Sequence, residues 1–435
     1  MNNGLEIPAA SLETRTIRKL RIRIIPFLFL LYIVAYLDRI NIGFAALTMN
    51  RELAITSQQF GFLVGVFFLG YFLFEIPSNL LLHKIGARIW IARILTSWGI
   101  VAALTGAVHT AWQLYVARFL LGVMEAGFFP GIVLYLTYWF RQRQQAQTIA
   151  LFMAGLPITS ILGGPISGLI LDHMHWFGIS SWRWLLILEA LPAVACGVLT
   201  YLFLPSRPAE ANFLTREEKD WIVATVQLED EQKRRKHHVS ALRTLANGRV
   251  WHLGAIGFTM ANGLYAMSFW MPQLIRSFSV RYSNTIVGVL VMIPHFIGLG
   301  AMILVSRSSD EKLERRFHIA VPAFIAGIAL LLLGRTSSPV LSIVLLSLVS
   351  LGIYSFYGPF FSFPSQFLTG FSAASGIALI NSVANLGGFV GPYAIGAINA
   401  RTGSLHGGLA AIGVSLFVSA TLVVLLPKEA GSFTS

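Results

Sequence analysis

The most constraining feature of this sequence is a series of long apolar runs. A membrane-spanning helix needs about 20 mostly apolar residues. Twelve runs reach that length: 24–49, 59–82, 88–108, 112–139, 146–171, 182–204, 251–275, 284–306, 317–336, 338–366, 371–399 and 406–426. Only 12% of the residues are charged, whereas a soluble domain has about 25%. We therefore predict an all-α integral membrane protein with twelve transmembrane helices, and not a soluble enzyme or binding module.

The positions of lysine and arginine predict the orientation of these helices. With an even number of spans both termini lie on one side, and that side carries 24 lysines and arginines against six on the other. Such an excess marks the cytoplasmic side. We therefore place both termini in the cytoplasm, and we attribute the net charge of +13 to anchoring at anionic lipid and not to nucleic-acid binding.

The chain divides into two halves that resemble repeats. His83 and Asp310 begin similar basic loops, and Pro165 and Pro392 lie in similar glycine-rich runs, both pairs at an offset of 227 residues. Transporters built from repeats bind substrate between the halves, near the membrane midplane. The predicted segments are a cytoplasmic N-terminal segment (1–23), a first six-helix bundle (24–204), a cytoplasmic linker (205–250), a second six-helix bundle (251–426) and a cytoplasmic tail (427–435).

Four ionisable residues lie deep inside predicted spans of the first half. They are Asp38 and Arg39 in the first run, and Arg118 and Glu125 in the fourth. Each costs about 2.5–3.5 kcal/mol at the centre of a bilayer, so they must face a polar cavity or one another. Adjacent residues point about 100° apart, so Asp38 or Arg39 must face another helix. Arginine suits a substrate carboxylate, and a poorly hydrated carboxylate suits proton transfer; a structural ion-pair cluster is the alternative.

Other polar residues in the spans are weaker candidates. We expect Glu75 to cap a helix or pair with loop arginines and Glu189 to pair locally, both in structural roles. Asn381 and Asn385 are four residues apart on one helix face, where they could bind substrate or tie helices together.

Signatures of enzymes and of metal sites are missing from the sequence. It contains no GxxxxGK, HExxH, GxSxG or GxGxxG motif. His173 and His175 have a spacing that could hold a metal, but no further ligands accompany them. We therefore expect a protein that is not an enzyme and that uses no cofactor or metal.

Short motifs spread over nearly the whole chain resemble the major facilitator superfamily. More narrowly, they resemble its anion:cation symporter family, which includes bacterial tartrate, phthalate, hydroxyphenylacetate and sugar-acid permeases. The matching residues are Tyr36 to Gly43, Glu75 to Asn79, Gly86 to Arg88, Arg118 with Gly122, Glu125 to Gly131, Gly163 to Pro165, and Asn381 to Pro392.

The resemblance implies two six-helix bundles, alternating access, and proton-coupled import of a small organic anion across the bacterial inner membrane by a monomer. It makes Asp38 and Glu125 the proton-coupling residues. The substrate-binding residues would be Arg39, Arg118, Tyr36, Tyr71, Asn381 and Asn385. A cytoplasmic gate would comprise His83, Arg88, Asp310 and Arg315.

One position bears on the substrate. Leu156 is apolar where sugar-acid permeases tend to carry a polar side chain, and Met153 and Pro157 lie beside it. This favours a tartrate-like dicarboxylate or an aromatic acid over a sugar acid. The open alternatives are a sugar-acid symporter, an exporter or exchanger on the same fold, sodium coupling, and a membrane receptor or assembly subunit that transports nothing.

Overall fold

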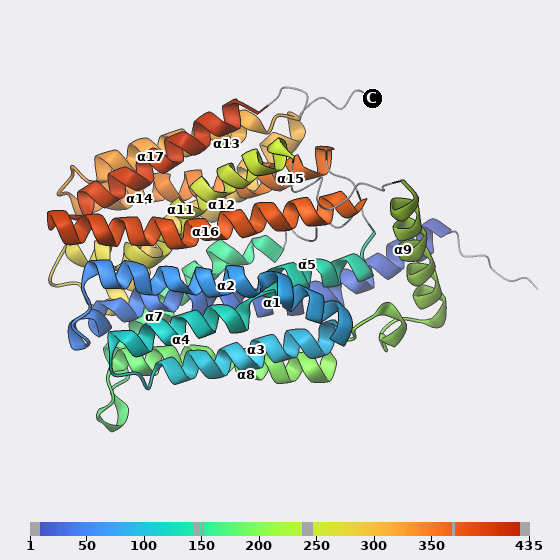
Figure 1. Cartoon of the computed structure of the whole chain (residues 1–435), viewed down its shortest axis with the longest axis horizontal. Helices are drawn as coiled ribbons and strands as arrows, with labels where there is room; N and C mark the ends of the chain where they lie inside the picture. Colours follow the sequence, from blue (N-terminus) through green and yellow to red (C-terminus); the bar gives the residue numbers. More distant parts are fainter. Residues whose placement is uncertain are drawn as a thin grey trace, which may run out of the picture.

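The computed structural model describes residues 9–426, apart from 142–143, 145–147, 149–151, 237–246 and 368–369, and the described part is helical without strands (Figure 1). The first half contains α1 (Ala9–Glu52), α2 (Ser57–Ile85), α3 (Ala87–Thr105), α4 (Ala111–Glu125), α5 (Phe128–Trp139), α7 (Gly155–His173) and α8 (Ser181–Phe203). The second half contains α11 (Gly248–Ser277), α12 (Asn284–Glu311), α13 (Arg316–Leu333), α14 (Pro339–Ser355), α15 (Tyr357–Phe367), α16 (Gly370–Thr402) and α17 (Leu405–Val424).

Ten of the described helical segments are long and apolar enough to cross a membrane, with α4–α5 and α14–α15 each forming one segment. The other two predicted spans correspond to α11 and α16, which contain 30 and 33 residues. These two helices pack against each other inside the protein, so they do not need the apolar surface of a lipid-facing helix. The prediction of an all-α membrane fold with twelve spanning units is confirmed.

The helices of the two halves run roughly along the long axis, with the second half of the chain on one side and the first half on the other (Figure 1). α1 begins, and α17 ends, at the same end as the polar helix α9 (Arg216–Lys236). We call this the α9 end and the opposite one the far end. Three helix pairs join the halves: α1 with α11, α2 with α16, and α7 with α12.

The two halves are in backbone contact at the far end. A Cβ on Gly164 of α7 would lie 2.6 Å from the carbonyl oxygen of Gly288 in α12, so only glycine permits this approach. Farther along, the Asp172 carboxylate accepts hydrogen bonds from the backbone N–H and the hydroxyl of Thr285, both at 2.7 Å. These contacts close the far end.

The fourth predicted run is broken in the middle. α4 ends at Glu125, and Gly127 adopts a φ of +84°, a left-handed conformation that favours glycine. A Cβ on Gly127 would also lie 2.7 Å from the Cβ of Ser78 in α2. The break places the Glu125 carboxylate at the end of α4, beside α1.

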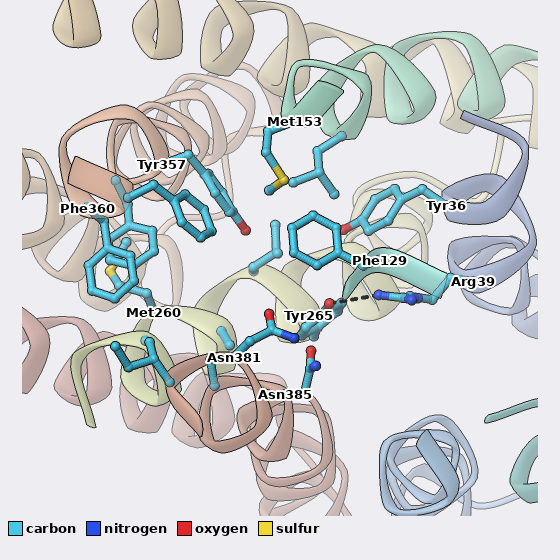
Figure 2. A pocket seen from close by; sticks show the side chains of 18 of the residues that line it. Tyr36, Arg39, Phe129, Met153, Met260, Tyr265, Tyr357, Phe360, Asn381 and Asn385 are labelled. Atoms are coloured by element: carbon cyan, nitrogen blue, oxygen red, sulfur yellow. Dashed lines mark hydrogen bonds between the residues drawn. The ribbon is translucent and has the colours of Figure 1, made fainter. Parts of the chain in front are cut away.

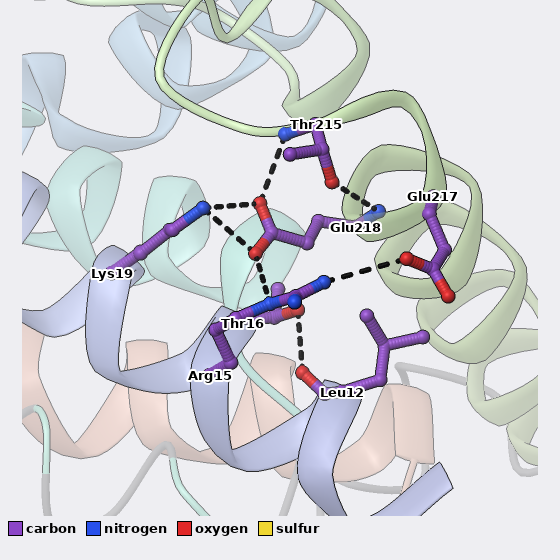
Figure 3. Close-up of polar contacts among 7 residues, drawn as sticks. All are labelled: Leu12, Arg15, Thr16, Lys19, Thr215, Glu217 and Glu218. Atoms are coloured by element: carbon purple, nitrogen blue, oxygen red, sulfur yellow. Dashed lines mark hydrogen bonds and ion pairs between the residues drawn. The ribbon is translucent and has the colours of Figure 1, made fainter. Parts of the chain in front are cut away.

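Helix α9 is clamped to the start of α1 by a buried carboxylate (Figure 3). The Glu218 side chain is fully buried and accepts hydrogen bonds from Arg15, Lys19 and the backbone N–H of Thr215, each at 2.9 Å. Glu217, in contrast, has a half-exposed side chain and a single contact at 3.4 Å to Arg15. Arg15 and Lys19 lie within helix α1, so this clamp holds α9 against the first turns of that helix.

This clamp predicts a specific pH dependence. Burial favours the neutral acid, but the hydrogen bonds from Lys19, Thr215 and Arg15 and the charge of Lys19 outweigh it and lower the pKa of Glu218. Its stabilising contribution is therefore complete above the usual glutamate pKa of about 4.3 and is lost as the pH falls through the lowered value. We expect Glu218→Gln to lower the melting temperature at pH 7 and the difference from wild type to vanish well below pH 4. The control is Glu217→Gln, and equal effects of both variants at pH 7 would contradict the clamp.

Candidate functional site

A cavity of about 90 Å3 lies between the two halves (Figure 2). The first half contributes Tyr36 and Arg39 from α1, and the second half contributes Tyr265 from α11 and Asn385 from α16. The lining also includes Gly257, which lies two turns nearer than Tyr265 to the start of α11, at the α9 end. The cavity thus extends from the middle of the protein toward the α9 end, while the far end is closed.

Arg39 is the central charge of this cavity. Its guanidinium forms an ion pair with Glu125 of α4 and donates a hydrogen bond from Nη1 to the Tyr265 hydroxyl at 3.0 Å. Its Cζ also lies 5.3 Å and 5.4 Å from the ring centroids of Phe67 and Tyr71. One side chain therefore links α1 to α4 in its own half and to α11 in the other half.

Asp38 points away from Arg39, into the interior of the first half. The indole Nε1 of Trp98 in α3 donates a hydrogen bond to Asp38 Oδ2 at 2.7 Å. Oδ1 has no hydrogen-bond partner among the described residues. The Asp38 side chain is 2% exposed and does not belong to the cavity lining, so the indole of Trp98 takes the place of solvent as its hydrogen-bond donor.

Arg118 is also buried outside the cavity lining. Its Nη2 lies 3.5 Å from the backbone oxygen of Arg39, and its Cζ lies 5.1 Å from the ring centroid of Phe67. Arg39, and not Arg118, is the ion-pair partner of Glu125. Arg118 thus supports the backbone of α1 at the position where Arg39 enters the cavity.

The neutral candidates lie around the cavity. Tyr36, Tyr71, Asn381 and Asn385 all belong to its lining. The structure therefore brings together five of the six predicted substrate-binding residues, and with them Glu125.

The partners expected for two buried carboxylates are wrong. Glu75 does not pair with loop arginines; it accepts hydrogen bonds from Asn381 at 3.0 Å and Ser382 at 2.9 Å, both in α16 of the other half. Glu189 does not pair with a residue close to it in the sequence; it accepts a hydrogen bond from Ser167 of α7 at 2.7 Å. Both carboxylates join separate helices, which the local sequence could not show.

The predicted gate residues lie at the α9 end. Asp310 and Arg315 form an ion pair at the turn between α12 and α13. Arg88 lies at the start of α3 with its Cζ 5.9 Å from the ring centroid of Tyr201. His83 falls in α2, but its side chain lies outside the described residues.

Sequence reasoning missed Trp98, which donates to Asp38, because no charge lies beside it in the sequence. Tyr265 is visible in the sequence as a polar side chain within an apolar run of the second half, but its hydrogen bond with Arg39 could not be predicted from it. Across the described ranges, no three His, Cys, Asp or Glu side chains gather into a group that could hold a metal ion. The chemistry of the cavity is that of one arginine, one carboxylate, and neutral hydroxyl and amide groups.

A double-mutant cycle can measure how much the hydrogen bond from the Trp98 indole to Asp38 contributes to stability. Leaving a buried carboxylate without its donor costs about 1–3 kcal/mol. We expect Trp98→Phe to lower the melting temperature of the purified protein, and to lower it much less in an Asp38→Asn background. Equal losses in both backgrounds would mean that Trp98 contributes packing only.

Sequence comparisons relate the chain to known membrane transporters. The sequence model described as Major Facilitator Superfamily matches residues 28–392. A putative tartrate transporter of Agrobacterium vitis is 45% identical over 97% of this chain and 96% of its own length. The putative metabolite transport protein NicT of Pseudomonas putida is 42% identical over 94% of both chains, and a quinolone resistance transporter of Acinetobacter baumannii is 37% identical over 91% of both.

Solved structures show the same fold. A bacterial homolog to the human lysosomal transporter Spinster, in an inward-facing and occupied conformation, superimposes with a TM-score of 0.72 at 16% identity, over 93% of this chain and 96% of that chain. The xylose transporter XylE from E. coli, in a partially occluded inward-open conformation, gives 0.73 at 14% identity, over 93% and 98%. The chain belongs to the major facilitator superfamily, and it is a multi-pass membrane transporter and not an enzyme.

Proposed function

We propose that this protein is a proton-coupled symporter that imports a small organic anion by alternating access. The observation that supports this most strongly is the ion pair between Arg39 and Glu125 on the cavity wall. In this state Glu125 occupies the position on Arg39 that a substrate carboxylate would need. Binding of the anion is thereby linked to loss of the charge on Glu125.

The linkage follows from electrostatics in a poorly hydrated site. When Glu125 takes up a proton, Arg39 keeps its charge and loses its counter-ion, which is strongly unfavourable in a buried position. A carboxylate restores the balance, and the planar guanidinium can hold it through two parallel hydrogen bonds. The loaded site then carries about the same net charge as the empty one, so the halves can move around it.

We assign Asp38 the role of a second proton site outside the cavity, as its burial and its single indole donor suggest. Arg118 is a positioning residue for α1. If two protons accompany a monoanion, one positive charge enters per cycle. The membrane potential then contributes about 2.3 kcal/mol per charge per 100 mV.

The lining favours an anion with one strongly bound carboxylate. Arg39 is the one arginine among the lining residues, and the opposite wall offers the neutral Asn381 and Asn385. Met153 and Leu156 supply apolar surface. A tartrate-like acid can place its second carboxylate and hydroxyls on the amides, and an aromatic acid can place its ring on the apolar wall. The relatives named putative tartrate transporters favour the first of these.

We further propose that the α9 end faces the cytoplasm, where the excess of lysine and arginine is expected. The bundles 24–204 and 251–426 of one monomer would then rock about the cavity, with 205–250 as the linker. In the described conformation the cavity is directed to the cytoplasm and the far end, closed by Gly164 and Gly288, faces the periplasm.

Export of amphiphilic compounds is the second candidate. It is favoured by the relative named quinolone resistance transporter and by the methionine and phenylalanine side chains of the lining, including Met153, Met260 and Phe360. An exporter on this fold would be driven by an outward gradient of its substrate or would exchange it for protons. Net direction of transport therefore separates the two candidates.

Proteoliposomes containing wild type or Glu125→Gln provide the test. Under an imposed proton gradient, with labelled L-tartrate outside, wild type should accumulate tartrate. Glu125→Gln should lose this accumulation but retain tartrate counterflow, because exchange of loaded carriers needs no deprotonation. Undiminished accumulation by the variant would remove Glu125 from the coupling. In vesicles preloaded with labelled tartrate, expulsion by wild type under the same gradient would favour the exporter.

A further inference from the structure

A third buried acid, Glu75, lies where the two halves meet. It follows Tyr71 by four residues and precedes Ser78 by three, so these side chains share one face of α2. The intervening Leu73, Phe74 and Ile76 are exposed on the outer surface, whereas Glu75 is 2% exposed. The helix therefore turns a single acidic residue inward, away from lipid and solvent.

The partners of Glu75 come from the opposite half. Its two oxygens accept hydrogen bonds from the Asn381 amide at 3.0 Å and the Ser382 hydroxyl at 2.9 Å, both in α16. Unlike Glu125, Glu75 has no ion pair among the described residues. The other charged or titratable groups in electrostatic reach are Arg39 of α1, Tyr71 of α2 and Tyr265 of α11.

The chemistry of these donors suits a carboxyl group that changes its protonation state. An arginine can only donate, so it tolerates a carboxylate and not a carboxylic acid. A serine hydroxyl and an asparagine amide can donate or accept. The pair Asn381 and Ser382 can therefore satisfy Glu75 both with and without a proton, at a depth where an unpaired charge is costly.

Glu75 is also connected to the substrate cavity. Asn381 belongs to the cavity lining, whereas Glu75 does not. A substrate that accepts the hydrogen bond of the Asn381 amide would remove one of the two donors that stabilise the charged form of Glu75. Because the donors belong to the other half, any relative movement of α2 and α16 would change the same contacts.

From this geometry we propose that Glu75 is a third proton-carrying carboxylate, which binds a proton when substrate or bundle movement draws Asn381 and Ser382 away and releases it when they return. This rests on the proposed proton-coupled import. In each cycle one proton moves from water on one side of the membrane to a Glu75 oxygen, and later from that oxygen to water on the other side.

The test measures how many protons accompany each substrate. In proteoliposomes clamped at zero membrane potential, each coupled proton multiplies the equilibrium accumulation ratio about tenfold per unit of pH difference. With labelled L-tartrate, Glu75→Gln should accumulate about tenfold less than wild type per pH unit while keeping counterflow. An accumulation ratio equal to that of wild type would overturn the proposal. A wild type that accumulates no tartrate would instead contradict the proposed function.

Ser382→Ala tests the same site without changing Glu75 itself or any residue of the cavity lining. Losing one donor destabilises the charged carboxylate. The pH dependence of uptake should therefore shift to higher pH, with an unchanged accumulation ratio. The matched control is Ser342→Ala, whose buried hydroxyl donates only to Ser338 of its own turn. Identical pH profiles for both variants and wild type would overturn the proposal.

An infrared titration decides the question without any substrate. Reconstituted wild type should show a carboxylic-acid band that disappears as the pH is raised and that is absent from Glu75→Gln. If the two spectra titrate identically, Glu75 does not exchange a proton, whatever the transported solute is.

Discussion

The structure depends on how the apolar interior of a membrane protein accommodates a buried arginine. Arg39 cannot lose its proton and cannot remain unpaired in the interior, so its surroundings must supply a negative charge. Glu125 supplies it from α4, and Tyr265 of the other half adds a hydrogen bond. A site held in this way is stable and exchangeable, because another carboxylate can replace the one provided by the protein.

The closed far end and the cavity are two consequences of the same arrangement of helices. Gly164 and Gly288 let α7 and α12 meet through their backbones, whereas the break at Gly127 turns the end of α4 toward α1. Glycines thus let the two halves meet closely at the far end, and polar contacts such as Asp172 to Thr285 and Arg39 to Tyr265 also join them. Because the inter-half contacts are hydrogen bonds and backbone contacts with few ion pairs, separating the halves exposes little uncompensated charge.

The sequence predicted the helices and most of the cavity because both follow from local patterns. Apolar runs show the spans, and Asp38, Arg39, Arg118 and Glu125 stand out against them. Partners far apart in the chain could not be predicted: Trp98 is 60 residues from Asp38, and Tyr265 is 226 residues from Arg39. The partner expected for Glu75 was wrong for the same reason, because its donors Asn381 and Ser382 lie 306 and 307 residues away in the chain.

In the proposed mechanism, a substrate carboxylate and Glu125 compete for Arg39. Calorimetric titration of the purified protein with L-tartrate, repeated in buffers of different ionisation enthalpy, measures the protons exchanged on binding. Binding should take up about one proton at a pH where Glu125 is charged in the free protein, because a displaced carboxylate loses its counter-ion. Glu125→Gln should bind without this uptake. Tartrate binding with no proton exchanged by the wild type would contradict the account.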